Sequence, residues 1–377
     1  MDRANVVILG GGVVGCAIAR ELSARWTDVF VLEKLPKIGM ATSTRNSGVI
    51  HSGIYYPPGS LKARFCLRGN QLTYEFCAAH DVPYRKIGKL VVASSIKEKD
   101  KLAALVKNGQ ANGVEGLRII DQAAIHSREP HIQGVQAIEV PSTGILSSED
   151  LVKAYARVAK DHGANIVTHA AVERLEPLRD GVRVTSAAGE IETRCLINSA
   201  GLFADDIAAM LGSKMARHRI YPVRGEYCEL ARSKQDMVRG LVYPLPHPEG
   251  MSLGLHLTKT LAGNVLLGPT ARYVDDKNDY ERDRIPIEEF ALGAQLLLPG
   301  VTSADLVPAY SGIRPKLVPP SKTSSTSPEQ KGIADFIVER DPEFPVVVHL
   351  MGIESPGLTS APAIAEHVGT LVNQILA

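Results

Sequence analysis

The sequence contains few cysteines, no long apolar run and almost no net charge, and each of these absences argues against a class of protein. Its five cysteines form no CxxC pair and no Cys/His cluster with zinc spacing, so we predict no metal site and expect reduced, buried thiols. No apolar run approaches the ~20 residues of a membrane-spanning helix, so no transmembrane segment is expected. The 42 Lys and Arg residues balance the 41 Asp and Glu residues, which argues against a nucleic-acid partner.

The start of the chain and its length set further limits. The first strand is expected within a few residues of the N-terminus, which leaves no room for a signal or transit peptide, so we expect a cytoplasmic protein. With 377 residues, 45% of them hydrophobic and 22% charged, the chain has the size of two domains or one large α/β unit.

The N-terminal residues have the pattern of a dinucleotide-binding unit. The apolar run 5–9 is typical of a strand buried on both faces of a parallel sheet, and a glycine motif and a helix follow it directly. In the motif, Gly10 permits a tight turn, Gly12 lets backbone amides approach a pyrophosphate, and Gly15 allows helix and strand to pack closely. The start of the helix adds partial positive charge for the phosphates.

A second strand over residues 29–32 ends at Glu33, where a carboxylate can accept hydrogen bonds from a ribose 2′-hydroxyl. An acidic residue here favours FAD or NAD over NADP. Chains that bind NAD usually continue with further βαβ units. Here the polar, glycine-rich segment 39–64 follows instead, and such a segment suits the extended length of FAD.

These motifs resemble the D-amino-acid-oxidase-like FAD-dependent oxidoreductases, and RNSGVIHSGIYYPPGSLKARFC is similar to their L-2-hydroxyglutarate dehydrogenase branch. Further similar stretches are spread along the chain: TGIL (143–146), SAGLFAD (199–205), VRGEY (223–227), LGLHLT (253–258), GIRPKL (312–317) and GIESPGLTSAPAIAEH (352–367). The resemblance implies FAD as cofactor and a small 2-hydroxy acid as substrate, most closely L-2-hydroxyglutarate oxidised to 2-oxoglutarate.

The expected fold is α/β (α+β overall), a Rossmann-type FAD-binding domain with an inserted substrate domain. We assign residues 1–80, 140–215 and 310–377 to the FAD-binding domain. Residues 81–139 and 216–309 are assigned to the substrate domain, an antiparallel sheet that covers the flavin. In this domain we expect a strand over residues 89–93 and helices over residues 96–112 and 287–298. The stretch 319–331, low in apolar residues, is expected to be a surface loop.

The glycine motif and the resemblance together assign a set of residues to the cofactor. These are Gly10, Gly12, Val13, Val14, Gly15, Glu33, Lys34, Thr42, Ser43, Arg45, Asn46, Ser47, Val172, Ala200, Gly201, Gly312, Arg314, Glu354, Ser355, Pro356, Gly357, Leu358 and Thr359. Amides at the start of the C-terminal helix are expected to face the flavin ring, where negative charge gathers on reduction.

Oxidation of a 2-hydroxy acid requires a group that holds the carboxylate and a base for the hydroxyl proton. Arg314 is our candidate for the carboxylate, because a guanidinium can donate two parallel hydrogen bonds to it. Candidates for a second carboxylate are Tyr55, Tyr56 and Arg224, together with Lys62 and Lys259.

Two of the eleven histidines are candidates for the base, because the ordinary pKa of histidine lies near the operating pH. His256 is the first choice. His51 is the second, as base or as flavin contact, and a covalent bond between His51 and the flavin stays open.

Two other interpretations stay open. The same fold also carries amine or amino-acid oxidases and glycerol-3-phosphate dehydrogenases, and a nucleotide-binding regulatory protein without turnover is a third possibility. The sequence also leaves open whether the electron acceptor is oxygen, a quinone or a carrier protein.

Overall fold

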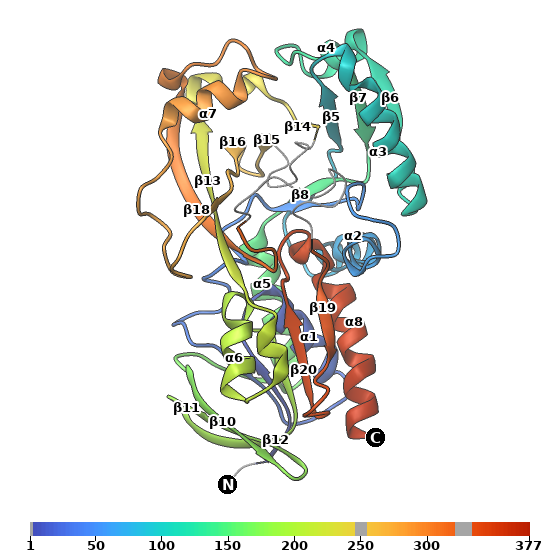
Figure 1. The fold of residues 1–377 in the computed structure, drawn as a ribbon. Coiled ribbons are helices and arrows are strands. Elements are labelled where there is room, and N and C mark those ends of the chain that lie inside the picture. The colour runs from blue at the N-terminus through green and yellow to red at the C-terminus, as the bar shows by residue number, and fades with distance from the viewer. Residues whose placement is uncertain (1–2, 246–254, 321–333) are drawn as a thin grey trace.

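The structure is a computed structural model, and it describes residues 3–245, 255–320 and 334–377. Residues 253–254 of the LGLHLT stretch and residues 321–331 of the expected surface loop lie outside the described residues. The molecule is elongated, with one sheet near the two chain ends, a second sheet at the opposite end, and helix α2 between them (Figure 1).

The first sheet has eight strands, and its centre is parallel. The order is β10–β11–β12–β1–β2–β9, with β20 beside β12 and β19 beside β20. The parallel strands are β1 (Arg3–Leu9), β2 (Val29–Leu32), β9 (Asn165–Val167), β12 (Gly189–Asn198) and β20 (Val347–Met351). The antiparallel strands at its edges are β10 (Val172–Leu178), β11 (Gly181–Ser186) and β19 (Ile337–Arg340).

Strand β1 is buried on both faces, as its apolar run predicts. Val6 and Ile8 belong to a core shared with the helices α1 (Val13–Ser23), α5 (Ser148–Asp161) and α8 (Gly357–Leu376). Val7 and Leu9 face the opposite way, into a core that includes residues of β10, β11 and α6 (Ala204–Met210). This alternation follows from the two-residue period of a strand.

The second sheet has nine strands in the order β17–β13–β16–β15–β14–β5–β7–β6, with β18 also paired to β13. All its pairings are antiparallel except β14 with β5. Its strands are β5 (Lys89–Ala93), β6 (Arg118–Asp121), β7 (Gln136–Val140), β13 (Tyr221–Leu230), β14 (Leu241–Pro244), β15 (His256–Lys259), β16 (Val265–Gly268), β17 (Arg272–Tyr273) and β18 (Leu306–Lys316). Strand β18 runs across the domain boundary expected between residues 309 and 310.

Two groups of helices cover this second sheet. Helices α4 (Gln122–Arg128) and α7 (Ile287–Ala294) contribute to one core, and α3 (Lys99–Ala111) contributes to another. The helix expected over 96–112 is divided, because Ser95 and Glu98 form a capping box that gives a 3₁₀ turn before α3 begins. The helix expected over 287–298 ends at Ala294.

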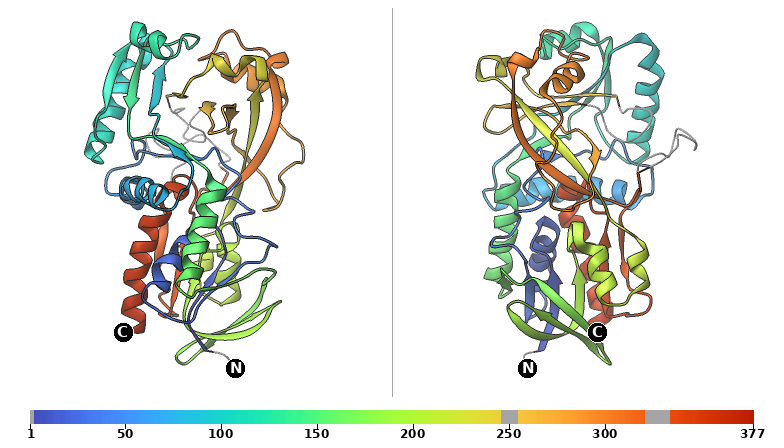
Figure 2. Two further views of the ribbon diagram at one scale, coloured as in Figure 1. Left: turned by 180° about the vertical axis from the view of Figure 1, so that it is seen from behind. Right: turned by 60° about the vertical axis from the view of Figure 1, so that its left-hand side comes forward.

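A small third sheet joins the two larger ones. It consists of β3 (Val49–Ile50), β8 (Gly144–Leu146) and β4 (Tyr84–Arg85). Helix α2 (Leu61–Ala79) begins at Ser60, whose hydroxyl accepts a hydrogen bond from the Ala63 amide, and it packs against α8. Both views of Figure 2 show α2 at the level where the two larger parts meet. The segment between β2 and α2 is therefore held between the sheets.

Candidate active site

One cavity of about 470 Å³ connects the first sheet to the second. Gly10 lines it in the turn after β1, and Lys34 lines it after β2. Gly312 of β18, Tyr243 of β14 and His256 of β15 line it from the second sheet. Residues far apart in the sequence thus share a single site.

At the end of β1 the backbone leaves no space for side chains. Gly10 has a φ of +104°, and a Cβ there would lie 2.7 Å from the Ser199 carbonyl oxygen. A Cβ at Gly15 would lie 2.0 Å from the Gly10 carbonyl oxygen. The turn and the start of α1 therefore depend on glycine, as the motif predicts.

The Glu33 carboxylate lies beside this turn at the cavity wall. Its Oε2 accepts a hydrogen bond from the Gly11 amide at 2.7 Å, and its Oε1 accepts one from the Leu35 amide at 2.8 Å. These bonds fix the carboxylate at the end of β2, where the sequence places a ribose contact.

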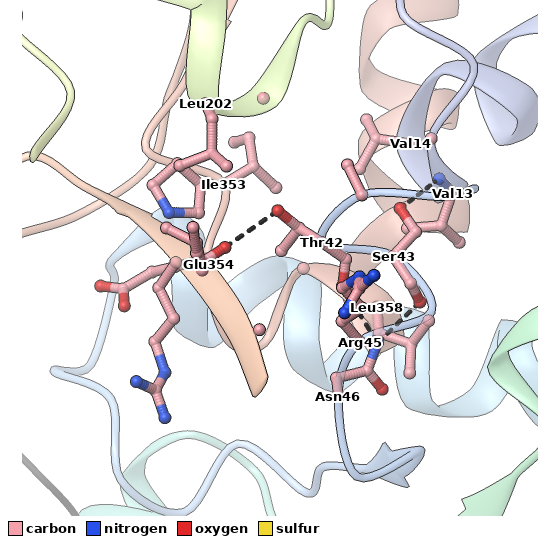
Figure 3. Close-up of a pocket in the computed structure, with 18 of the residues that line it drawn as sticks. Val13, Val14, Thr42, Ser43, Arg45, Asn46, Leu202, Ile353, Glu354 and Leu358 are labelled. Carbon is pink, nitrogen blue, oxygen red and sulfur yellow. Dashed lines mark hydrogen bonds between the residues drawn. The ribbon is translucent and has the colours of Figure 1, made fainter. Parts of the chain in front are cut away.

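The segment 42–47 forms one wall of the cavity beside β18 (Figure 3). The Ser43 hydroxyl accepts a hydrogen bond from the Val13 amide at 2.8 Å, and the Thr42 hydroxyl donates one to the Ile313 carbonyl at 2.9 Å. A Cβ at Gly312 would lie 2.0 Å from the Arg45 carbonyl oxygen, so β18 and this segment touch through their backbones. The segment is therefore fixed to both sheets.

His51 lies where this segment meets the start of α8. Its backbone amide donates to the Thr359 hydroxyl at 2.9 Å, and its Nε2 lies 3.2 Å from the Ser355 hydroxyl. Burial, with a smaller contribution from the positive charge of Lys89, lowers the pKa of His51 to about 3. The imidazole is therefore neutral at physiological pH.

Arg314 and His256 enter the cavity from the second sheet. The Arg314 guanidinium occupies the space above Gly225, where a Cβ would lie 2.7 Å from Nη1, and it donates to the Thr270 carbonyl at 3.0 Å. No carboxylate of the three described ranges forms an ion pair with it. The His256 ring stacks on Tyr243, with centroids 3.5 Å apart and an interplanar angle of 9°. A guanidinium and two imidazoles thus line the same cavity.

Most residues assigned from the sequence line this cavity. They are Gly10, Gly12, Val13, Val14, Glu33, Lys34, Thr42, Ser43, Arg45, Asn46, Ser47, His51, Tyr55, Tyr56, Lys62, Val172, Ala200, Gly201, His256, Gly312, Arg314, Glu354, Ser355, Pro356, Gly357 and Leu358. Gly15 and Thr359 lie directly behind its wall. Lys259 does not line it, and its ammonium donates to the Gln235 carbonyl at 2.7 Å.

Arg224 is not at the cavity, contrary to its assignment as a substrate-binding residue. Its side chain is fully buried, with Nε 3.0 Å from Glu226, Nη1 3.1 Å from Asp279 and Nη2 3.2 Å from the Asp283 carbonyl oxygen. These bonds hold all three nitrogens of the guanidinium away from the cavity, so the structure assigns Arg224 to the stability of the second sheet.

Replacing Arg224 by methionine is expected to lower the free energy of unfolding by about 3–5 kcal/mol, because Glu226 would lose its buried partner. Chemical denaturation followed by circular dichroism measures this loss. The control is Arg179→Met, which removes an exposed arginine and should change stability by less than about 0.5 kcal/mol. If Arg224→Met has unchanged stability and binds substrate more weakly, Arg224 is a substrate-binding residue after all.

Two cavity features were not assigned from the sequence. Tyr243, at the cavity wall, belongs to a short apolar strand with no motif that marks it. Glu354 pairs with Lys62 at 2.9 Å, in an ion pair that joins residues 292 positions apart. Neither feature has a local signal, because each depends on contacts between distant segments.

Residues 5–371 match the family described as "DAO: FAD dependent oxidoreductase". The chain belongs to this family. A protein named "L-2-hydroxyglutarate dehydrogenase, mitochondrial" from Arabidopsis thaliana is 36% identical, and the match covers 97% of this chain and 83% of that protein. The L-2-hydroxyglutarate dehydrogenase of Escherichia coli K12 is 33% identical, with 99% and 94% covered.

Solved structures show the same fold. The FAD-bound L-alpha-glycerophosphate oxidase of Mycoplasma pneumoniae superposes with a TM-score of 0.87 at 26% identity, covering 99% of this chain and 95% of that one. Glycine oxidase from Geobacillus kaustophilus gives a TM-score of 0.81 at 20% identity, covering 99% and 95%. The predicted fold class, the FAD cofactor and the oxidoreductase activity are confirmed by these matches and by family membership.

The site also fits FAD by its own geometry. The glycine turn, the carboxylate of Glu33 and the segment 42–47 form a continuous wall along the cavity. At its far end the Nδ1 of His51 and the hydroxyl of Tyr55 are buried with no hydrogen-bond partner among the described residues. Buried polar atoms of this kind are costly unless a ligand satisfies them.

The described residues contain neither a membrane-spanning helix nor a cluster of metal-binding side chains. Within them no helix has the length and apolarity to cross a bilayer. Nor does this part of the chain bring three or more His, Cys, Asp or Glu side chains together in a way that could hold a metal ion.

Proposed function

We propose that the protein oxidises L-2-hydroxyglutarate to 2-oxoglutarate with FAD as the hydride acceptor. The observation that carries this proposal is the cavity itself, where Arg314, with no carboxylate partner among the described residues, shares one space with His256 and the glycine turn. The near full-length similarity to relatives named L-2-hydroxyglutarate dehydrogenase supports the choice of substrate.

In this proposal the first sheet holds the cofactor. The amides after Gly10 and at the start of α1 bind the pyrophosphate, and Glu33 accepts hydrogen bonds from the ribose. The residues of segment 42–47, which line the same cavity, would contact the bound cofactor. The amides at the start of α8, near Gly357, stabilise negative charge on the ring. Bound FAD supplies the two-electron redox chemistry.

The second sheet and the 51–56 loop hold the substrate. The Arg314 guanidinium donates two hydrogen bonds to the carboxylate next to the hydroxyl. The hydroxyls of Tyr55 and Tyr56 bind the second carboxylate. His256 accepts the proton of the hydroxyl group, and neutral His51 is the second candidate for this step. Lys62 is a weaker candidate for the substrate, because its ammonium is already paired with Glu354 at 2.9 Å.

Anaerobic addition of L-2-hydroxyglutarate to the purified yellow protein is expected to bleach the visible flavin absorption, because the substrate reduces the bound cofactor. D-2-hydroxyglutarate is the matched control and should leave the spectrum unchanged, since its hydrogen at C2 points to the opposite side once both carboxylates are held. Bleaching by an amino acid or by glycerol 3-phosphate, and by no 2-hydroxy acid, would contradict the proposal.

The proposed cellular location is the cytoplasm, as expected from the sequence. The Arabidopsis thaliana relative is named mitochondrial, whereas the name of the Escherichia coli relative gives no compartment. Fractionation of the native cells tests this point directly.

A further inference from the structure

Lys89 is a buried lysine with no ordinary partner. It begins β5, its side chain is 3% exposed, and its ammonium has no hydrogen-bond acceptor within the described ranges. No Asp or Glu carboxylate of those ranges lies within ion-pair distance of it either. A buried ammonium without an anion is unfavourable, because it has lost its hydration.

Two tyrosines of the cavity wall lie against this ammonium. The Nζ of Lys89 is 4.5 Å from the ring centroid of Tyr55 and 4.9 Å from that of Tyr243. The Tyr243 ring also stacks on the proposed base His256. The faces of the two rings carry negative charge, so they attract the ammonium without neutralising it. Lys89 therefore contacts two residues of the cavity wall directly and reaches a third, His256, through Tyr243.

In residues 3–245, 255–320 and 334–377, no carboxylate forms an ion pair with Lys89. Cys66 of α2 and His51 are the other titratable groups that interact with it. On β7, Val140 is opposite Lys89, while its neighbour Glu139 belongs to the other face and is bound by Arg118 and Arg128. Burial lowers the pKa of the Lys89 ammonium to about 7. A small change in nearby charge is thus enough to change its protonation.

We propose that Lys89 is the positive charge that selects substrates with a second carboxylate. In this inference, which rests on the proposed function, the second carboxylate accepts a hydrogen bond from the Tyr55 hydroxyl, which is buried and has no partner among the described residues. Lys89 lies on the ring of the same tyrosine and neutralises the charge. Lys89 is a positioning residue, because it acts through Tyr55 and Tyr243.

Binding of a dianionic ligand and protonation of Lys89 are expected to favour each other. A dianionic ligand raises the pKa of Lys89, so the ligand binds best when Lys89 is protonated. At a pH above the pKa of the ligand-free protein, Lys89 therefore takes up a proton when the ligand binds. Affinity is therefore full below the pKa of the ligand-free protein, at about 7, and falls as the pH rises above it. In the wild type, affinity for 2-oxoglutarate should fall by about tenfold between pH 6.5 and pH 8.5.

The test is a titration of the FAD-loaded protein with 2-oxoglutarate, followed by the change in the flavin spectrum. At pH 6.5, Lys89→Met is expected to bind 2-oxoglutarate about 30-fold more weakly than the wild type, because one partly screened charge contact is lost. Its affinity should not depend on pH, so the difference from the wild type should shrink as the pH rises to 8.5. Binding of 2-oxobutyrate, which lacks the second carboxylate, should change by less than about threefold. Lys89→Arg should restore much of the affinity and keep it constant with pH, since arginine stays protonated.

Lys234→Met is the matched control, because it removes a lysine at the protein surface whose side chain is 40% exposed. Its affinity for both ligands should equal that of the wild type. Equal losses for 2-oxoglutarate and 2-oxobutyrate in Lys89→Met, or no loss at all, would overturn the role of Lys89.

The wild type alone also tests the inference if Lys89→Met does not fold. Calorimetry at pH 8 in buffers of different ionisation enthalpy should give an uptake of about one proton per 2-oxoglutarate bound. No uptake, with normal binding, overturns the role of Lys89 and leaves the proposed function standing. A wild type that is neither bleached by L-2-hydroxyglutarate nor able to bind 2-oxoglutarate overturns both.

Discussion

Replacing Arg314 by methionine is expected to lower kcat/KM for L-2-hydroxyglutarate by about 10³-fold, because two charge-assisted hydrogen bonds to one carboxylate are lost. The protein should still fold and bind FAD, because within the described residues the Arg314 guanidinium makes a single hydrogen bond to protein, to the Thr270 carbonyl at 3.0 Å. Steady-state kinetics and the flavin spectrum measure the two effects separately.

Two variants refine this test. Arg314→Lys keeps the charge but not the paired geometry, so it should recover only part of the activity. Gly225→Ala does not change residue 314, but it adds a Cβ 2.7 Å from the Nη1 of Arg314. This Cβ should displace the guanidinium and so weaken substrate binding. The surface variant Arg179→Met is the control. Full activity of Arg314→Met would exclude Arg314 from substrate binding.

The fold could be predicted where the local sequence determines it. Strands at residues 29–32 and 89–93 lie where they were expected, because each is an apolar run that ends in polar or small residues. The helix expected over 96–112 was too long, because the capping box at Ser95 and Glu98 starts a separate turn. The local hydrophobic pattern continues across that break.

In the site, too, some features follow from the local sequence and others depend on long-range contacts. The glycine turn is a local motif, and Gly10 and Gly15 occupy positions that exclude a Cβ. Arg224 and Gly225 are neighbours on β13, yet Arg224 enters a buried acidic cluster while Gly225 makes room for Arg314. Which neighbour faces the cavity depends on the pairing of β13 with β18, and the sequence of one strand does not contain that information.

Lys89 is the clearest example of a residue that sequence analysis could not assign. It begins an apolar strand, where a lysine usually extends its ammonium into solvent. Its burial depends on Tyr55 from the loop after β3 and Tyr243 from β14, and only the folded chain brings these rings together. Long-range contacts of this kind carry no local pattern.

Replacing His256 by asparagine is expected to lower kcat by about 10³-fold, because the substrate hydroxyl would lose its general base. Binding of 2-oxoglutarate should change by less than about threefold, since asparagine keeps a polar group of similar size on β15. Stopped-flow reduction of the flavin measures the first effect, and spectral titration measures the second. A loss confined to binding would make His256 a substrate contact instead of the base.

His51→Asn is the matched variant, and the pH dependence of flavin reduction separates the two histidines. Because burial lowers the pKa of His51 to about 3, a reaction that used His51 as base would keep its rate down to about that pH. A decrease in rate as the pH falls through about 6 is therefore expected to persist in His51→Asn. If this decrease disappears in His51→Asn and persists in the residual activity of His256→Asn, the two assignments must be exchanged.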